Sequence, residues 1–141
     1  MGGVVGAAGA AAAGGDGPVV RVAIYGAGGH SRNAHAPSLR ALPGVEIVAI
    51  ADPNRELATQ LAADFAPGAR LYSDGAEMLE AEELDALFSV VPARVRPQGV
   101  EAAAARKGVA LFSEKPQTLD MATARGIADA VAVIRTKISE I

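Results

Sequence analysis

The chain has 141 residues, half of them hydrophobic, and a formal net charge of −3, which is enough for one domain with its own core. The absence of cysteine excludes disulfides, thiolate metal sites and a cysteine nucleophile, and with only two histidines we expect no metal site. The charges are interspersed without a basic patch, so we expect no nucleic-acid partner.

The segment 1–17 is rich in glycine and alanine and is of low complexity. It lacks the basic start and the leucine-type run of a signal peptide, and it is too short and too rich in glycine to span a membrane. We interpret it as a disordered leader or a start-site artefact. A cytoplasmic location without a membrane partner follows, and a weak secretion signal is the less favoured alternative.

After Pro18 the sequence alternates between strand and helix patterns. Apolar runs predict strands over 19–25, 45–51, 69–73, 84–91 and 109–113. A helix is predicted over 31–42, in which Pro37 either kinks the helix or sits near its first turns. Further helices are predicted over 53–65 with Leu57, Leu61 and Phe65 on one apolar face, briefly after a cap at Asp74, over 100–108 ending at Gly108, and over 119–134.

Several of the predicted strands are apolar on both faces and alternate with helices, which is typical of a parallel sheet covered on both sides. The predicted fold class is therefore α/β, with a doubly wound parallel sheet. The domain is expected over 18–134, followed by a tail over 135–141.

A glycine-rich turn follows the first predicted strand, in the stretch "RVAIYGAGGHS". Gly26 and Gly28 match the first two positions of the G-x-G-x-x-G/A dinucleotide fingerprint, and Ser31 takes the third. Gly26 permits a tight turn, Gly28 admits a pyrophosphate close to the backbone, and the following helix presents N–H groups and its positive dipole end. An ordinary turn without a ligand is the alternative interpretation.

Asp52 ends the second predicted strand, where the fingerprint places an acid. A carboxylate there accepts the adenosine ribose hydroxyls and repels a 2′-phosphate, which favours NAD over NADP. Two alternatives stay open. Asp52 is also suited to cap a helix with Pro53 at its first position, and the nearby Arg55 could accommodate the 2′-phosphate of NADP.

The stretch "VALFSEKPQTLD" brings Glu114, Lys115 and Pro116 to the end of another strand. Ligands of open α/β sheets bind beyond the carboxyl ends of the strands, so these residues are candidates for a ligand site. A solvated ion pair of little energetic value is the alternative.

Together "RVAIYGAGGHS", "IVAIADPN", "LDALFSVVP" and "ARKGVALFSEKP" resemble the nucleotide-binding half of the Gfo/Idh/MocA oxidoreductases, over about residues 19–133. The resemblance implies a Rossmann domain that binds NAD or NADP and oxidises a hydroxyl of a sugar, a cyclitol or a related compound. The implied catalytic residue is Lys115. The implied cofactor contacts are Gly26, Gly28 and Gly29 at the pyrophosphate, Asp52 at the adenosine ribose, Pro92 and Glu114 at the nicotinamide side, and His30, Ser31, Asn54, Arg55, Lys115 and Pro116 around them.

The sequence departs from the family pattern in two places. Where the family has T-P-N-x-x-H, residues 91–96 read V-P-A-R-V-R, so two arginines intrude near the nicotinamide side. The family also carries a second α/β domain with the substrate pocket, and this chain stops at Ile141. We therefore expect a truncated chain whose own activity is open, with a partly apolar exposed face and a tendency to self-associate.

Three functional alternatives remain from the sequence. The first is the cofactor domain of an oxidoreductase, the second is a dinucleotide-binding module without turnover, and the third is an S-adenosylmethionine methyltransferase, against which the E-K-P triplet argues. His30 and His35 lie on or near the first helix and are expected to be exposed, with no role as a catalytic base.

Overall fold

Five short apolar segments form one parallel sheet in the computed structural model, which describes residues 17–97, 99–116 and 118–139. The strand order is β3-β2-β1-β4-β5. Val22 of β1 lies between Ile47 of β2 and Ala86 of β4, so the central strand is paired on both sides. The strands are β1 (Val20–Tyr25), β2 (Val45–Ala51), β3 (Arg70–Tyr72), β4 (Ala86–Ser89) and β5 (Ala110–Ser113).

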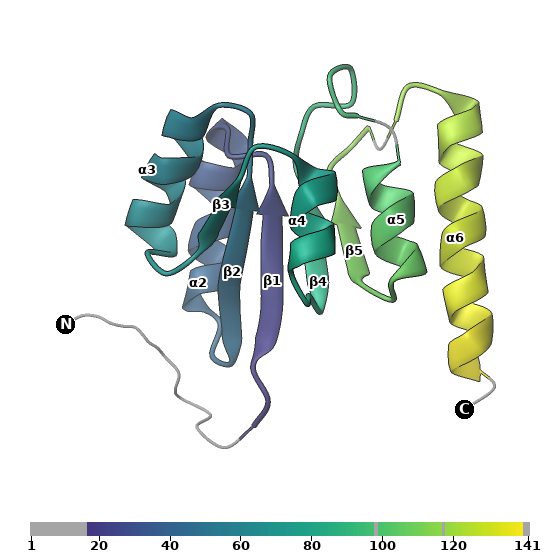
Figure 1. Cartoon of the computed structure of the whole chain (residues 1–141), viewed down its shortest axis with the longest axis horizontal. Coiled ribbons are helices and arrows are strands. Elements are labelled where there is room, and N and C mark those ends of the chain that lie inside the picture. Colours follow the sequence, from purple (N-terminus) through teal and green to yellow (C-terminus); the bar gives the residue numbers. More distant parts are fainter. Residues whose placement is uncertain (1–16, 98, 117, 140–141) are drawn as a thin grey trace.

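Helices cover both faces of this sheet (Figure 1). The short helices η2 and α2 together with α3 lie on one face, α4 and α5 lie on the other, and α6 packs against α5. This arrangement confirms the predicted doubly wound α/β fold. The helices are η2 (Ser31–His35), α2 (Ala36–Ala41), α3 (Arg55–Phe65), α4 (Gly75–Ala81), α5 (Val100–Arg106) and α6 (Met121–Ser139).

The central strand β1 shows why its sequence is apolar throughout. Val22 and Ile24 are buried against α2 and α3, whereas Ala23 and Tyr25 are buried against α4 and α5. Successive side chains of a strand point to opposite faces, so a strand covered on both sides has no polar face. The sheet order reverses direction between β1 and β4, and the crevice beyond the carboxyl ends of these strands is where open α/β sheets bind ligands.

The helix α3 corrects two expectations. It begins at Arg55, and its cap is Asn54, whose side chain accepts hydrogen bonds from the N–H groups of Glu56 and Leu57. Asp52 is therefore not the helix cap, and Pro53 precedes the helix. Leu57, which we placed on the apolar face, is exposed; the buried positions of the helix are Ala58, Leu61 and Ala62.

Pro37 lies in the first turn of α2, which confirms one of its two expected positions, and a π-helical turn precedes it. In η2 the N–H of Ala36 donates to the carbonyl of Ser31, five residues earlier. Proline has no N–H and clashes with the carbonyl four residues before it in a regular α-helix. The wider turn immediately before Pro37 accommodates both properties.

The remaining differences concern the ends of elements. Asp74 caps α4 as expected, accepting from the N–H of Ala76, and Gly108 follows α5 with a φ of +79°. β4 is shorter than predicted, and α6 continues past Ile134 to Ser139. The segment 1–16 lies outside the described residues. Among the described residues, no helix is long and apolar enough to cross a bilayer.

Candidate functional site

The glycine turn after β1 is shaped by contacts on two sides. Gly26 has a φ of +105°, and its N–H donates to the Ala51 carbonyl of β2 at 2.8 Å. A Cβ at Gly26 would lie 2.9 Å from the Val91 nitrogen in the loop after β4. Both the backbone angle and the close approach require glycine here. At Gly28 an added Cβ would meet nothing within 4 Å, so this part of the turn faces open space.

Ser31, at the third fingerprint position, is fully buried. Its hydroxyl donates to the Gly26 carbonyl at 2.5 Å. A small residue at this position lets the helix pack closely on the strand. The hydroxyl of Ser31 therefore joins the start of η2 to the first glycine of the turn.

Asp52 is held directly against the glycine turn. One carboxylate oxygen accepts from the Ala27 N–H and the other from the Asn54 N–H, both at 2.7 Å. A carboxylate has about four acceptor positions, so further donors can still bind to it. Asp52 therefore fixes the turn between β1 and η2 and keeps acceptor capacity for a ligand. Arg55, at the first position of α3, is exposed.

A second group of predicted site residues lines a pocket of about 450 Å³ at the carboxyl ends of β4 and β5. Glu114, Lys115 and Pro116 contribute from the segment after β5, and Pro92 and Arg94 from the loop after β4. Of the residues around the glycine turn, His30 reaches this pocket, whereas Gly26, Gly28 and Asp52 do not line it. The structure thus places the predicted residues in two neighbouring groups, joined where Val91 approaches Gly26.

Glu114 is engaged by both histidines of the chain. Its Oε2 lies 2.8 Å from the Nε2 of His35 and 3.0 Å from the Nε2 of His30. The hydrogen bond from His35 is the main cause of a pKa for Glu114 below its usual range, and His30 adds to it. Glu114 is therefore held as a carboxylate in a fixed orientation.

The expectation of an exposed His35 is wrong, whereas His30 is indeed exposed. The His35 side chain is only 13% exposed. Its ring makes edge contacts with Phe88 and Phe112, at centroid distances of 5.6 and 5.1 Å. The sequence pattern could not indicate this burial, because the side chain of His35 is directed towards the sheet only through the π-helical turn η2.

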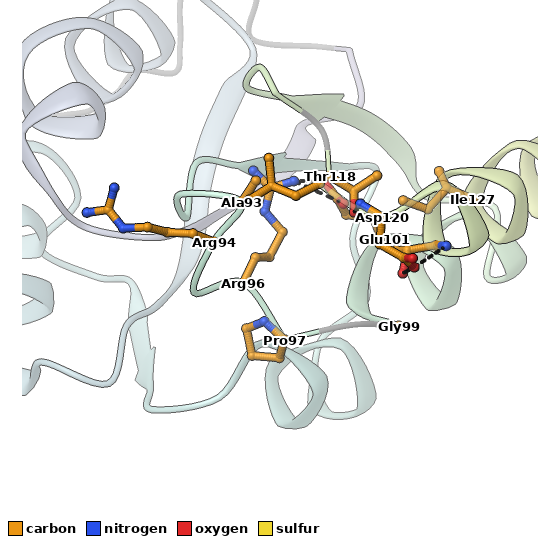
Figure 2. Close-up of a pocket in the computed structure, with 11 residues that line it drawn as sticks. Ala93, Arg94, Arg96, Pro97, Gly99, Glu101, Thr118, Asp120 and Ile127 are labelled. Atoms are coloured by element: carbon orange, nitrogen blue, oxygen red, sulfur yellow. Dashed lines mark hydrogen bonds and ion pairs between the residues drawn. The ribbon is translucent and has the colours of Figure 1, made fainter.

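The two arginines that interrupt the family pattern have different environments. The side chains of Arg96 and Glu101 are both about 95% buried and form an ion pair at 3.0 Å. Arg96 also donates to the Val91 carbonyl, and Ser113 donates to Glu101 at 2.5 Å. Arg96 therefore ties the loop after β4 to α5 and β5. Figure 2 shows Arg96 beside Glu101, whereas the side chain of Arg94 points away from both. Arg94 is exposed.

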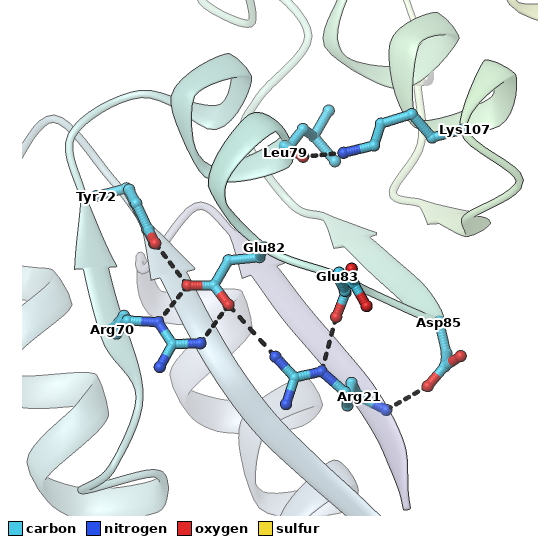
Figure 3. A network of polar contacts seen from close by, with 8 residues as sticks. All are labelled: Arg21, Arg70, Tyr72, Leu79, Glu82, Glu83, Asp85 and Lys107. Atoms are coloured by element: carbon cyan, nitrogen blue, oxygen red, sulfur yellow. Dashed lines mark hydrogen bonds and ion pairs between the residues drawn. The ribbon is translucent and has the colours of Figure 1, made fainter.

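A separate polar network surrounds Glu82, which is 3% exposed, just after α4 (Figure 3). Its carboxylate accepts from Arg70 and from the hydroxyl of Tyr72, and it lies 3.4 Å from an Arg21 nitrogen. The hydrogen bond from Arg70 is the largest cause of a lowered pKa for Glu82, and burial opposes it. This network joins β1, β3 and α4, and none of its members lines the pocket.

The sheet order 3-2-1-4-5, the glycine turn after β1 and the acid after β2 define a Rossmann domain of the dinucleotide-binding class. The sequence matches, over residues 20–137, the model of the Gfo/Idh/MocA group, an oxidoreductase family with an NAD-binding Rossmann fold. The chain belongs to this family, as the sequence motifs predicted.

Two curated relatives and one solved structure illustrate the match. The D-apiose dehydrogenase of Paraburkholderia graminis is 39% identical over 74% of this chain and 27% of its own length. The inositol 2-dehydrogenase of Agrobacterium fabrum is 33% identical over 79% of this chain and 33% of its own length. The myo-inositol dehydrogenase of Lactobacillus casei was solved with NAD(H) and myo-inositol, and it is 31% identical to this chain with a TM-score of 0.67. The match covers 82% of this chain and 34% of the dehydrogenase. The chain spans about a third of the length of the curated relatives it matches.

Proposed function

We propose that this chain is the cofactor half of a dehydrogenase that transfers a hydride between NAD and a hydroxyl of a sugar, cyclitol or related compound. One observation carries the proposal. Asp52 is bonded to the glycine turn at the carboxyl ends of β1 and β2, and Glu114 and Lys115 follow β5 on the same edge of the sheet. The matched relatives are dehydrogenases named for inositol and apiose, which supports this substrate class.

The residues around the glycine turn suit a dinucleotide. The open space at Gly28 admits a pyrophosphate close to the backbone. The remaining acceptor positions of Asp52 suit the adenosine ribose hydroxyls, with Asn54 beside it. Gly29 and His30 follow Gly28 in the turn and would face the rest of the dinucleotide, whereas the buried Ser31 supports the turn from behind. The negative charge of Asp52 favours NAD, and the exposed Arg55 supports NADP as the second choice.

The pocket residues suit the reacting end of the cofactor and the substrate. A bound nicotinamide supplies the hydride acceptor. Glu114, held as a carboxylate by His35, can accept from a ribose hydroxyl, and Pro92 and Pro116 shape the apolar wall. Lys115 is our candidate for the catalytic residue: its Nζ would donate to the oxygen of the reacting hydroxyl and orient it.

The proposal is tested by titrating the chain with NADH and NADPH and following nicotinamide fluorescence. We expect saturable NADH binding that is at least about tenfold weaker in Asp52→Ala, because charged hydrogen bonds contribute about 1.5–3 kcal/mol each. The matched control is Glu46→Ala, which removes an exposed carboxylate near the other end of β2. A folded wild-type chain that binds neither nucleotide would refute the proposal, and tighter NADPH binding would overturn the choice of NAD.

Hydride transfer is tested separately. A protein in which this domain is joined to a substrate domain is expected to reduce NAD with a cyclitol or sugar, and Lys115→Ala is expected to lower kcat. Saturable binding of NADH without turnover on any polyol would instead favour the dinucleotide-binding module.

A further inference from the structure

His30, His35 and Glu114 bring three metal-ligating atoms to one place. One imidazole nitrogen of each histidine and one carboxylate oxygen of Glu114 all lie within 4.8 Å of one another. They come from two distant parts of the chain, the first helix and the segment after β5. Within the described residues, they are the one such group of three or more histidines and acids. The composition alone had led us to expect no metal site.

The π-helical turn η2 is what brings the two histidines to the same side. In an α-helix, residues five apart are separated by about 140° around the axis, so they face different directions. Here the hydrogen bond of η2 spans five residues, and the rings of His30 and His35 meet edge to face with centroids 4.9 Å apart. π-helical turns of this kind occur often at functional sites.

The donor set and its spacing suit a zinc-class ion. Two imidazoles and one carboxylate are the ligands of many catalytic zinc sites, which leave a fourth position open. Tetrahedral ligands at the usual zinc distances lie about 3.3 Å apart. The contacts of Glu114 to His35 and His30 are 2.8 and 3.0 Å. To admit the ion, each of these two contacts would lengthen by about half an ångström or less, and the two imidazole nitrogens, which lie within 4.8 Å of each other, would take up the same spacing.

The surroundings hold two of the ligands in place and leave the third accessible. Phe88 and Phe112 are stacked with centroids 4.8 Å apart, and both contact the ring of His35. The carboxylate of Glu114 is 25% exposed, whereas the His30 side chain is 59% exposed and lines the pocket. An ion would therefore enter from the pocket and keep an open coordination position towards it.

We propose that His30, His35 and Glu114 bind one divalent transition-metal ion of the zinc class at the mouth of the pocket. The ion replaces the hydrogen bonds between the histidines and Glu114. It adds two positive charges to a pocket that Lys115 and Arg94 already line. An anionic or polyhydroxy ligand in the pocket could then take the open position.

The experiment is a titration of the intact chain with Zn²⁺ against a chromophoric chelator, with no nucleotide present. We expect one Zn²⁺ per chain and an affinity at least tenfold weaker in each of His30→Gln, His35→Gln and Glu114→Gln. The matched control is Glu80→Gln, which changes an exposed carboxylate on α4 and should leave the affinity unchanged. Because the His30 side chain is exposed, its variant keeps the proposal testable even if the variant at the largely buried His35 does not fold.

A second readout uses the wild-type chain alone. Co²⁺ at one equivalent is expected to give the intense visible absorption of a four-coordinate site and to shift the proton resonances of both histidine rings. Zn²⁺ affinity that is equal in the control and all three ligand variants would overturn the proposal, as would a Co²⁺ spectrum identical to that of the aqueous ion. Neither measurement depends on NAD binding, so failure of the proposed function and failure of the metal site are distinguishable.

Discussion

A methyl group added at Gly26 would lie 2.9 Å from the Val91 nitrogen, whereas one added at Gly28 would contact nothing within 4 Å. The two glycines of one turn therefore have different roles. Gly26 is required by the fold, since its φ is +105° and the loop after β4 approaches it closely. The space beside Gly28 is free for a ligand.

This contrast predicts opposite behaviour of two variants. Gly28→Ala is expected to leave the free energy of unfolding unchanged or to raise it by up to about 1 kcal/mol, because alanine loses less chain entropy on folding. It should nevertheless weaken NADH binding at least about tenfold, because the added methyl occupies the space of the pyrophosphate. A fluorescence titration measures the affinity for NADH, and urea unfolding measures the free energy of unfolding. Unchanged NADH affinity in Gly28→Ala would contradict the assignment of the pyrophosphate to this turn.

Gly26→Ala is the companion variant. Its unfolding free energy should fall by about 1–3 kcal/mol, the usual cost of a sparsely populated backbone conformation. The clash with Val91 adds to this cost because the contact atom is backbone and cannot rotate away. Equal stability of Gly26→Ala and the wild type in urea would show that the turn can adopt another shape.

At the scale of elements, the sequence pattern predicted the five strands and their order of occurrence, with β2 correct at both ends. The reason is physical: buried parallel strands need unbroken apolar runs, and the turns between them need glycine, proline or caps such as Asp74. The π-helical turn could not be predicted, because it depends on how the helix packs beside Pro37. The contact of His35 with Glu114 joins residues distant in the sequence and could not be predicted either. The burial of Arg96 depends on how the loop after β4 folds back on α5 and β5, which no local pattern indicates.

The Glu82 network links three elements and should be visible in the pH dependence of stability. The pKa of Glu82 is lower in the fold than its ordinary value of 4.5, mainly because Arg70 donates to it. The carboxylate thus stabilises the fold above about pH 4.5, and this contribution is lost as the pH falls through the lowered pKa. In Glu82→Gln the free energy of unfolding at pH 7 should fall by about 1–3 kcal/mol.

The acid dependence distinguishes this network from general charge effects. Urea unfolding of Glu82→Gln between pH 3 and pH 7 should show a shallower loss of stability than the wild type. Glu80→Gln, which changes an exposed carboxylate in the last turn of α4, should retain the wild-type slope. If both variants lose stability with acid as steeply as the wild type does, the lowered pKa of Glu82 is not a source of stability.

At the scale of the whole molecule, the two most exposed large apolar side chains among the described residues, Leu119 and Met121, follow the last strand of the sheet. That strand, β5, is an edge strand. Phe112 on β5 is 44% exposed, and Leu119 and Met121 in the segment that follows are 70% and 66% exposed. An edge strand flanked by exposed apolar side chains is a ready surface for association.

The chain is therefore expected to self-associate as its concentration rises, with sedimentation velocity as the measurement. The double variant Leu119→Ser and Met121→Ser should weaken association at least about tenfold, since burying each of these side chains contributes about 1.5–3 kcal/mol. Val19→Ser, which removes an exposed apolar side chain just before β1, is the matched control and should associate as the wild type does. A single sedimentation coefficient at all concentrations would mean that this edge does not pair with a second copy. The exposed apolar side chains would then be ordinary surface residues, which most proteins tolerate singly in water.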